Sequence, residues 1–455
     1  MAEQLYDVVI IGGGVTGTAL LYTLVQFTDL QRLALIEKYP AIAAVNSRAT
    51  NNSQTIHCGD IETNYSLEKA VQVQRNASML VHYCMQLPPQ ERDRIIYRFS
   101  KMVLGVGQAE VDFLRQRYEV FRPHFPRMKL LEKEQLAEIE PLVVKGERGD
   151  RPEELVGLGI LSDYTAINYG ALAQSFVEQA QASPGKTVDL QLGIKVRGIE
   201  PVGQHYRIST DTGTLKARFV VVSAGGHSLL FAHRLGFGLE YSCLPVAGSF
   251  YFTPQVLNGK VYTIQNDKLP FAAIHGDPDV TMPGKTRFGP TALPLPLLER
   301  YNRQTLWDYL QVLRPDAAVT AVLWDLFKEA DIRNYMFKNI AFEIPLLNRR
   351  LFLQEVRKIV PSLNLADLEV AHGVGGIRPQ LIDKRSRKLI LGQAAIAPEA
   401  GLRFNITPSP GATNCLGNAE QDAIQIQHYL GCEFAQERFE AELVRPPYPV
   451  LSSNA

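Results

Sequence analysis

Residues 6–37 read YDVVIIGGGVTGTALLYTLVQFTDLQRLALIE and decide the fold. An apolar, β-branched run over 6–11 leads directly into a glycine turn over 12–17. A helical pattern follows, and a second apolar run over 33–36 ends in an acid at position 37. The order of strand, glycine turn, helix, strand and acid is that of a dinucleotide-binding βαβ unit.

The three spaced glycines of this turn meet separate physical needs. Gly12 permits the tight turn, Gly14 lets the backbone approach a pyrophosphate, and Gly17 lets the helix pack closely against the strand. The helix N-terminus offers free N–H groups to the phosphates, and Glu37 is suited to accept hydrogen bonds from a ribose diol. A glycine turn in an ordinary βαβ unit is the alternative interpretation. Val15, next to Gly14, and Lys38, next to Glu37, are also predicted to contact the dinucleotide.

A second feature of the dinucleotide type lies far along the chain. Residues 218–226 (RFVVVSAGG) read as a buried parallel strand that runs into small residues. The end of this strand, at Ala224 and Gly225, and Val196 in an earlier strand are expected to line the same site. The nucleotide-binding domain is therefore predicted to be discontinuous in sequence.

The expected fold class is α/β, with a Rossmann-like FAD-binding domain and a substrate domain of antiparallel sheet plus helices. The runs 243–253, 261–264 and 271–275 are the predicted strands of the substrate sheet. We predict that the FAD-binding domain comprises 1–85, 150–235 and 341–455, and that the substrate-binding domain comprises 86–149 and 236–340.

Bulk composition excludes several classes of protein. The 455 residues carry 47 basic and 47 acidic side chains, so nothing favours nucleic acid. Five scattered cysteines without a CxxC pair predict reduced thiols, a cytoplasmic setting and no metal site. No apolar run is long enough to span a membrane, and the acidic N-terminal residues argue against a signal peptide. Peripheral attachment to the inner face of the cytoplasmic membrane stays open.

Three later segments are rich in small and polar residues, as in loops that contact a ligand. They are 46–60 (NSRATNNSQTIHCGD), 373–380 (GVGGIRPQ) and 404–414 (FNITPSPGATN). Together with the glycine turn, they resemble the D-amino-acid-oxidase-like group of FAD enzymes over nearly the whole chain. Within that group, TNNSQTIHCGDIETNYS at 50–66 is most similar to the shorter, epsilon-proteobacterial type of malate:quinone oxidoreductase.

This resemblance implies FAD as cofactor, a dicarboxylic 2-hydroxy acid as substrate and a membrane quinone as electron acceptor. It also places several loop residues at the flavin. Backbone N–H groups of the late loop would face the flavin pyrimidine edge, where negative charge grows on reduction. The loop residues that it implies at the cofactor are Asn52, Ser53, Gln54, Gly376, Gly411, Ala412 and Thr413.

Oxidation of a 2-hydroxy acid requires a base for the hydroxyl proton and an acceptor for the α-hydrogen, which leaves as hydride to flavin N5. His57 and His275 lie in ligand-type sequence contexts, and neutral imidazole is available as a base near pH 7. We expect one of them to take the proton and the other to orient the substrate. The sequence does not decide which histidine has which role.

The substrate carboxylates require fixed cations. Arg378, in its glycine-flanked loop, is the predicted bidentate clamp. Arg287 and Arg48 are weaker candidates for the second carboxylate, and Tyr251 and Gln54 are candidate hydrogen-bond partners of the substrate.

Three other functions remain as alternatives. The nearest is an L-2-hydroxyglutarate dehydrogenase or oxidase of the same fold, although such enzymes usually read Arg-Ala-Gln where this chain has Arg378-Pro379-Gln380. The others are an FAD amine oxidase acting on amino acids and a non-catalytic nucleotide-binding subunit. The oligomeric state stays open.

Overall fold

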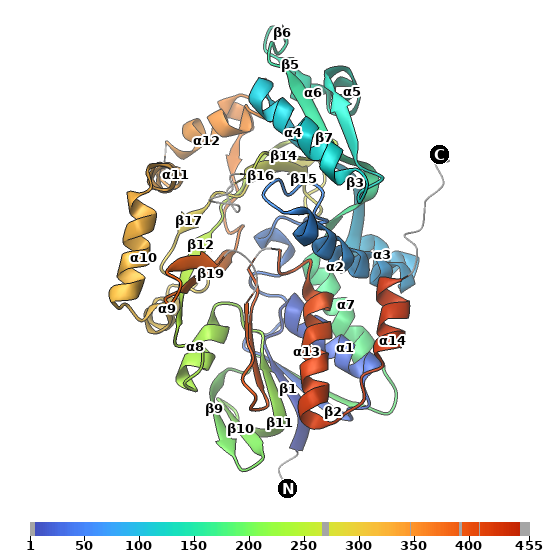
Figure 1. Cartoon of the computed structure of the whole chain (residues 1–455), viewed down its shortest axis with the longest axis vertical. Helices are drawn as coiled ribbons and strands as arrows, with labels where there is room; N and C mark the ends of the chain where they lie inside the picture. Colours follow the sequence, from blue (N-terminus) through green and yellow to red (C-terminus); the bar gives the residue numbers. More distant parts are fainter. Residues whose placement is uncertain (1–4, 266–272, 346, 391–393, 409, 446–455) are drawn as a thin grey trace.

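A computed structural model describes residues 5–265, 273–345, 347–390, 394–408 and 410–445. Two large sheets lie at opposite ends of an elongated molecule (Figure 1). The sheet that contains the first strand lies in the lower half of the view, and the second large sheet lies in the upper half. None of the helices in the described ranges is both long and apolar enough to cross a membrane.

The first sheet has eight strands and is built around the N-terminal strand. β1 (Leu5–Ile11) lies between β11 (Thr214–Val222) and β2 (Arg32–Glu37) and runs parallel to both, so that Val9 is opposite Val220 on one side and Ala34 on the other. The path β21-β22-β11-β1-β2-β8 is extended from β11 by a meander of two further strands. The other strands are β8 (Thr187–Leu192), β9 (Val196–Val202), β10 (His205–Thr210), β21 (Ala394–Ile396) and β22 (Leu402–Ile406).

Helices from distant parts of the chain pack beside this sheet. α1 (Val15–Phe27) is buried at every position except Gln26, because α7 (Tyr169–Gln181) and α13 (Cys415–Leu430) pack against it. A helix that is apolar on all sides belongs in a protein interior. The strand–turn–helix–strand unit and the late parallel strand predicted from the sequence are both confirmed.

The second large sheet has the order β18-β13-β16-β15-β14-β3-β7-β4. Its longest pair is β3 (Ile96–Val106) with β7 (Leu155–Ile167), which run antiparallel. The remaining strands are β4 (Lys129–Glu132), β13 (Tyr251–Pro254), β14 (Lys260–Thr263), β15 (His275–Pro278), β16 (Lys285–Gly289) and β18 (Glu369–Val370).

A smaller sheet of order β17-β12-β19-β20 joins the two halves. Its strands are β12 (Tyr241–Ala247), β17 (Leu293–Pro294), β19 (Ile377–Asp383) and β20 (Lys388–Ile390), and a separate two-stranded ribbon is formed by β5 (Lys145–Gly146) and β6 (Gly149–Asp150). The longer remaining helices are α2 (Leu67–Gln86), α4 (Gln108–Phe121), α8 (His227–Arg234), α9 (Thr305–Leu313), α10 (Ala317–Lys328), α11 (Ala330–Ala341) and α12 (Asn348–Val356). The short ones are α3 (Pro89–Ile95), α5 (Lys133–Ile139), α6 (Pro141–Val144) and α14 (Gln436–Phe439).

The predicted segment boundaries do not follow the sheets everywhere. β7 was expected in the FAD-binding segment 150–235, and it pairs with β3 and β4 in the second sheet. β19, within 341–455, pairs with β12. No local sequence pattern predicts either pairing, because a buried strand has the same apolar pattern whichever sheet it joins. Of the predicted strand 271–275, residues 271–272 lie outside the described residues, and β15 begins at His275.

Candidate active site

The glycine turn brings the start of α1 against the ends of β1 and β11. Gly12 has a φ of +117°, and a Cβ there would lie 2.3 Å from the carbonyl oxygen of Ser223. A Cβ on Gly17 would lie 2.1 Å from the carbonyl oxygen of Gly12. Only glycine permits this approach, so the helix N-terminus lies directly beside the carboxyl ends of the parallel strands, where such folds bind dinucleotides.

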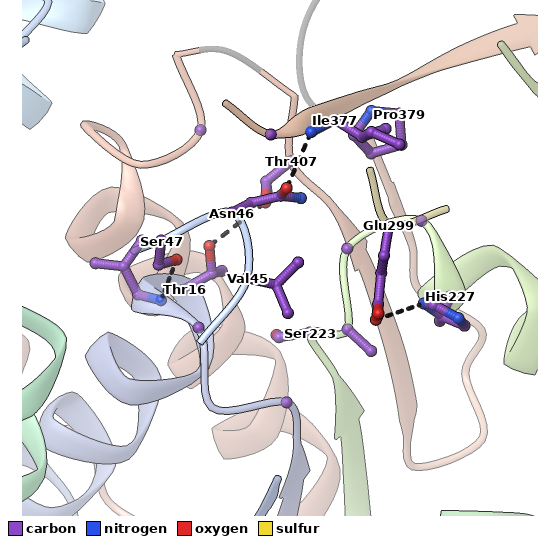
Figure 2. A pocket seen from close by; sticks show the side chains of 18 of the residues that line it. Thr16, Val45, Asn46, Ser47, Ser223, His227, Glu299, Ile377, Pro379 and Thr407 are labelled. Carbon is purple, nitrogen blue, oxygen red and sulfur yellow. Dashed lines mark hydrogen bonds and ion pairs between the residues drawn. The ribbon is translucent and has the colours of Figure 1, made fainter. Parts of the chain in front are cut away.

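A cavity of about 450 Å³ opens at this point between the two halves of the molecule. Early and late segments of the chain meet at its wall (Figure 2): the hydroxyl oxygens of Thr16 and Thr407 lie 3.4 Å apart, and Ile377 N donates to Asn46 Oδ1 at 3.0 Å. The strand end at Ser223 forms part of its wall (Figure 2). Most predicted cofactor contacts line it, namely Gly12, Gly14, Val15, Glu37, Lys38, Asn52, Ser53, Val196, Ala224, Gly225, Gly376, Gly411, Ala412 and Thr413.

Glu37 occupies the position expected for a ribose-binding acid. Its Oε2 accepts a hydrogen bond from Gly13 N at 2.7 Å, and its Oε1 accepts one from Tyr39 N at 2.9 Å. These backbone bonds fix the carboxylate at the end of β2, on the wall of the cavity. Each carboxylate oxygen retains a second acceptor position, so the geometry suits a ribose diol.

Sequence reasoning missed a polar cluster next to Glu37. Lys38 forms an ion pair with Glu299, and the Tyr39 hydroxyl donates to the same carboxylate at 2.6 Å. His227, at the start of α8, lies 4.0 Å from Glu299 through Nδ1 (Figure 2) and 3.3 Å from Asp308 through Nε2. These partners come from segments far apart in the sequence, and no local pattern marks them.

The late loop 404–414 leads into α13 and packs against the histidine loop. A Cβ on Gly411 would lie 2.4 Å from the carbonyl oxygen of Thr407, so the turn is tight. The Thr413 hydroxyl is hydrogen-bonded to Tyr169 Oη at 2.8 Å and accepts from His57 N at 3.2 Å. Ser409, part of the predicted motif, lies outside the described residues.

His57 lines the cavity, and its ring contacts a buried carboxylate. Its Nδ1 lies 2.6 Å from Oε1 of Glu62, a residue that the sequence analysis did not single out although it lies within the quoted segment 50–66. The His57 side chain is 14% exposed and that of Glu62 is 2% exposed. Because the two ring nitrogens lie on opposite sides of imidazole, Nε2 points away from Glu62.

Arg378 also lines the cavity, on β19. Its guanidinium lies within electrostatic reach of Tyr335 on α11 and Tyr262 on β14. Desolvation lowers the pKa of Arg378 below its ordinary value. A guanidinium nevertheless stays charged over the physiological range, so the cavity wall carries a fixed cation.

His275 lies behind the cavity wall and not among the residues that line it. It is 3% exposed, its ring stacks on Tyr262 with centroids 4.2 Å apart, and its Nε2 lies 3.2 Å from Asp277 Oδ1. Burial lowers the pKa of His275 to about 4, so the ring is neutral at physiological pH. Of the two predicted histidines, His57 lines the cavity and His275 does not.

Five other predicted site residues are also absent from the cavity wall. Arg287 is fully buried and lies 3.3 Å from Asp277 and 3.4 Å from Asp279, and Gln54 donates to Asp279 at 3.2 Å. Tyr251 stacks on Phe352 and donates to a backbone carbonyl oxygen. Arg48 is exposed. Gly17 lies beneath the turn, as its predicted packing role requires.

No group of three or more His, Cys, Asp and Glu side chains converges as a metal site anywhere in the part of the chain that the structure describes. The five cysteines are free thiols, and four of them are buried. The cavity instead combines a glycine-turn helix terminus, a ribose-type acid, a histidine and an arginine.

Comparison with solved structures identifies the class of fold. The chain superimposes on glycine oxidase from Geobacillus kaustophilus with a TM-score of 0.62 and 19% identity, covering 93% of this chain and 95% of that one. The same values hold for an FAD-bound L-α-glycerophosphate oxidase from Mycoplasma pneumoniae. The fold is thus that of the FAD-dependent oxidoreductases, and the predicted fold class is confirmed.

The sequence defines the family within that class. Residues 4–418 match the family model described as malate:quinone oxidoreductase (Mqo). A probable malate:quinone oxidoreductase of Campylobacter jejuni is 46% identical over 98% of this chain and all of that protein. The malate:quinone oxidoreductase of Helicobacter pylori is 46% identical over 96% of this chain and 98% of that protein. The chain belongs to the malate:quinone oxidoreductase family of FAD-dependent oxidoreductases, as predicted.

Proposed function

We propose that the chain oxidises (S)-malate to oxaloacetate with FAD as cofactor and passes the electrons to a membrane quinone. The observation that carries this proposal is one cavity that joins a dinucleotide-binding turn to His57 and Arg378. Family membership supports the choice of substrate and acceptor.

The residues on the cavity wall fit FAD. The N-terminus of α1 would hold the pyrophosphate, and Glu37 would hold the ribose of the adenosine part. Lys38 and the other basic residues of that wall suit the phosphate charge. Ala412 and Thr413 would present backbone N–H groups to the flavin pyrimidine edge, whereas the N–H of Gly411 donates to the Pro408 carbonyl oxygen at 2.7 Å. When bound, FAD supplies the acceptor for the hydride that leaves the substrate carbon.

The chain's own residues would bind the substrate and remove its proton. Arg378 would bind one carboxylate of malate through its paired N–H groups. His57 would accept the hydroxyl proton at Nε2, since its Nδ1 is hydrogen-bonded to Glu62. We propose a purely structural role for Arg287, Tyr251 and Gln54, because Arg287 is ion-paired with Asp277 and Asp279 and the other two side chains are hydrogen-bonded within the protein.

We also propose that the cofactor-binding domain is discontinuous. Its sheet is drawn from 5–37, 187–222 and 394–406, and the substrate-facing domain is built on the second large sheet with the helices that follow it. The cavity lies between these parts, where two-domain enzymes commonly bind substrate.

For the acceptor, an exposed apolar surface on α9–α11 suits contact with a membrane. Its most exposed members are Trp307, at 70%, Phe337, at 56%, and Trp324, at 55%. These helices run along the left edge of the molecule in Figure 1. They also border the site, because Asp308 of α9 lines the cavity and Tyr335 of α11 lies near Arg378. Exposed tryptophan and phenylalanine are typical of helices that lie in a bilayer surface.

A steady-state assay tests this function. Purified protein loaded with FAD is supplied with (S)-malate and a short-chain quinone, while oxaloacetate is trapped and measured. We expect one oxaloacetate for each quinone reduced. Turnover of L-2-hydroxyglutarate in place of malate would move the function to the nearest alternative. Peroxide release with amino acids would move it to the amine oxidase class.

A further inference from the structure

The buried carboxylate of Glu62 contacts the ring of His57, the proposed base. We propose that Glu62 is a positioning residue that fixes the orientation and tautomer of His57, so that Nε2 faces the substrate as an unprotonated base. The inference rests on the proposed function, because it assigns a partner to the histidine of that reaction. It is carried by the 2.6 Å contact between Glu62 Oε1 and His57 Nδ1 and by the fold of the loop around it.

The loop that contains both residues is fixed by two buried cations. Lys101, on β3, donates to the Ile56 carbonyl oxygen at 3.2 Å and to Asp60 Oδ1 at 2.8 Å. Arg117, on α4, donates to the Glu62 carbonyl oxygen at 2.7 Å. The segment is therefore held on both sides of Glu62 by bonds that do not involve its carboxylate.

This arrangement distinguishes a positioning role from an ordinary structural ion pair. The hydrogen bonds of Arg117 go to the backbone carbonyl oxygens of Glu62, Thr63 and Tyr65. Among the described residues, Oε2 of Glu62 has no hydrogen-bond partner. A buried carboxylate oxygen without a partner is costly, so a residue that served stability alone would be better replaced by an apolar one. The retained polar contact is the one to His57.

The charge state of Glu62 sets the tautomer of His57. Burial raises the pKa of Glu62, but the hydrogen bond from His57 and the positive charge of Lys101 hold that pKa below its ordinary value. An ionised carboxylate accepts and does not donate, so Nδ1 must carry the proton and Nε2 is left unprotonated in the neutral ring. Other charged or titratable groups that interact with Glu62 are Arg117, Lys69, Cys58, Tyr65 and Tyr262.

Proton transfer then has a defined route. The O–H bond of the substrate breaks, its proton forms a bond with Nε2, and the ring becomes an imidazolium. Glu62 stabilises that cation without taking its proton, as the carboxylate does in an Asp–His pair of a hydrolase. At metal sites, a hydrogen bond from the second ring nitrogen to a carboxylate orients histidine ligands in the same way.

The test is Glu62→Gln, which keeps the shape and removes the charge. We expect the limiting rate of flavin reduction by malate, measured in stopped flow without oxygen, to fall about 100-fold or more. The apparent Kd for malate should change by less than about threefold, because Arg378 is intact. Glu68→Gln is the matched control, since Glu68 is exposed at the start of α2 and loses the same charge.

Two further readouts separate positioning from structure. The midpoint of the rate–pH profile should move to lower pH in Glu62→Gln, because the charge that stabilises the imidazolium is gone. The second readout is NMR of the histidine ring nitrogens in labelled protein, with His57→Ala to identify the His57 signal. We expect His57 to be protonated at Nδ1 in the parent protein. In Glu62→Gln we expect a mixture of the Nδ1-protonated and Nε2-protonated tautomers. An unchanged rate, profile midpoint and tautomer in Glu62→Gln would overturn the inference.

A failure of the proposed function gives a different pattern. If malate does not reduce the flavin of the parent protein, the function is wrong, and the NMR result still decides whether Glu62 sets the tautomer. If Glu62→Gln loses FAD or does not fold, Glu62→Asp is measured instead. That variant keeps the charge, so its profile midpoint should stay near the parent value, and a midpoint that moves as far as the one expected for glutamine would count against the charge-based role.

Discussion

At the residue scale, the two groups that would act on the substrate come from opposite ends of the chain. His57 belongs to the loop after β2, and Arg378 belongs to β19. Both line the same cavity, whereas His275, which the sequence ranked equally with His57, is buried on Tyr262 behind the wall. Burial and partners, which a sequence does not display, distinguish the two histidines.

Replacing His57 tests the proposed base. We expect His57→Ala to lower the limiting rate of flavin reduction by malate about 100-fold or more, because general-base catalysis is lost. FAD occupancy, measured from the flavin spectrum, should stay near that of the parent protein. His124→Ala, at an exposed position after α4, is the control. Reduction at the parent rate in His57→Ala would remove His57 from the chemistry.

Replacing Arg378 tests the carboxylate clamp. Arg378→Lys keeps the charge and loses the paired N–H groups, so the apparent Kd for malate should rise about tenfold or more while FAD stays bound. The Kd comes from the malate dependence of the stopped-flow reduction rate. Arg385→Lys, in an exposed turn, should leave the Kd unchanged. Equal affinities in Arg378→Lys and the parent would exclude Arg378 from substrate binding.

At the element scale, the strand–turn–helix unit was predictable because its requirements are local. The glycine spacing, the strand before it and the acid after it all lie within forty residues, and the structure joins them as expected. The pairings of β7 and β19 were not predictable, because strand partners are chosen by packing between segments far apart in sequence. The same limit hid Glu299 and His227, which meet Lys38 and Asp308 only in the folded chain.

The glycine turn gives a direct test at this scale. In Gly17→Ala the new Cβ would lie 2.1 Å from the Gly12 carbonyl oxygen, so α1 must move away from β1. We expect weaker FAD binding and a loss of stability of about 1–3 kcal/mol, as overpacking usually costs. Gly198→Ala, where a Cβ would meet nothing within 4 Å, is the matched control. Measurements are the FAD Kd and the free energy of unfolding, and equal values for both variants would contradict the close-packing role.

The buried histidine of β15 gives a pH-dependent prediction. The pKa of His275 is lowered to about 4 from the ordinary 6.5, so within this window the unfolded chain binds more protons than the folded one. Stability contributed by this group is therefore lost as pH falls from 6.5 towards 4, by about 3 kcal/mol at most. We expect His275→Asn to flatten that part of the pH dependence of the free energy of unfolding. His428→Asn, exposed on α13, should keep the parent slope, and a parent-like slope in His275→Asn would contradict the assignment.

At the scale of the whole molecule, the helices that carry the exposed apolar surface, α9–α11, also border the cavity. α11 turns Tyr335 towards Arg378 and leaves Phe337 exposed, so the helix lies between the site and the solvent. This arrangement would let electrons pass from the site to an acceptor held in a bilayer without a second redox centre.

Charging this surface tests the membrane contact. The double variant Trp307→Glu, Trp324→Glu should lower binding to lipid vesicles at least about tenfold, because each large apolar side chain contributes about 1.5–3 kcal/mol on burial. Turnover with a long-chain quinone in the vesicles should fall in parallel, while reduction of the flavin by malate stays the same. The control is Phe113→Glu, Val120→Glu, which charges two exposed apolar positions of α4. Unchanged vesicle binding in the tryptophan variant would exclude this surface.

In the proposed function, malate is bound and oxidised in this cavity. The most direct measurement is an oxygen-free titration of the FAD-loaded protein with (S)-malate and, in a separate cuvette, with L-2-hydroxyglutarate. The proposed function predicts that malate bleaches the flavin absorbance, that one oxaloacetate forms for each flavin reduced, and that hydroxyglutarate leaves the flavin oxidised. Bleaching by hydroxyglutarate with no response to malate would contradict it.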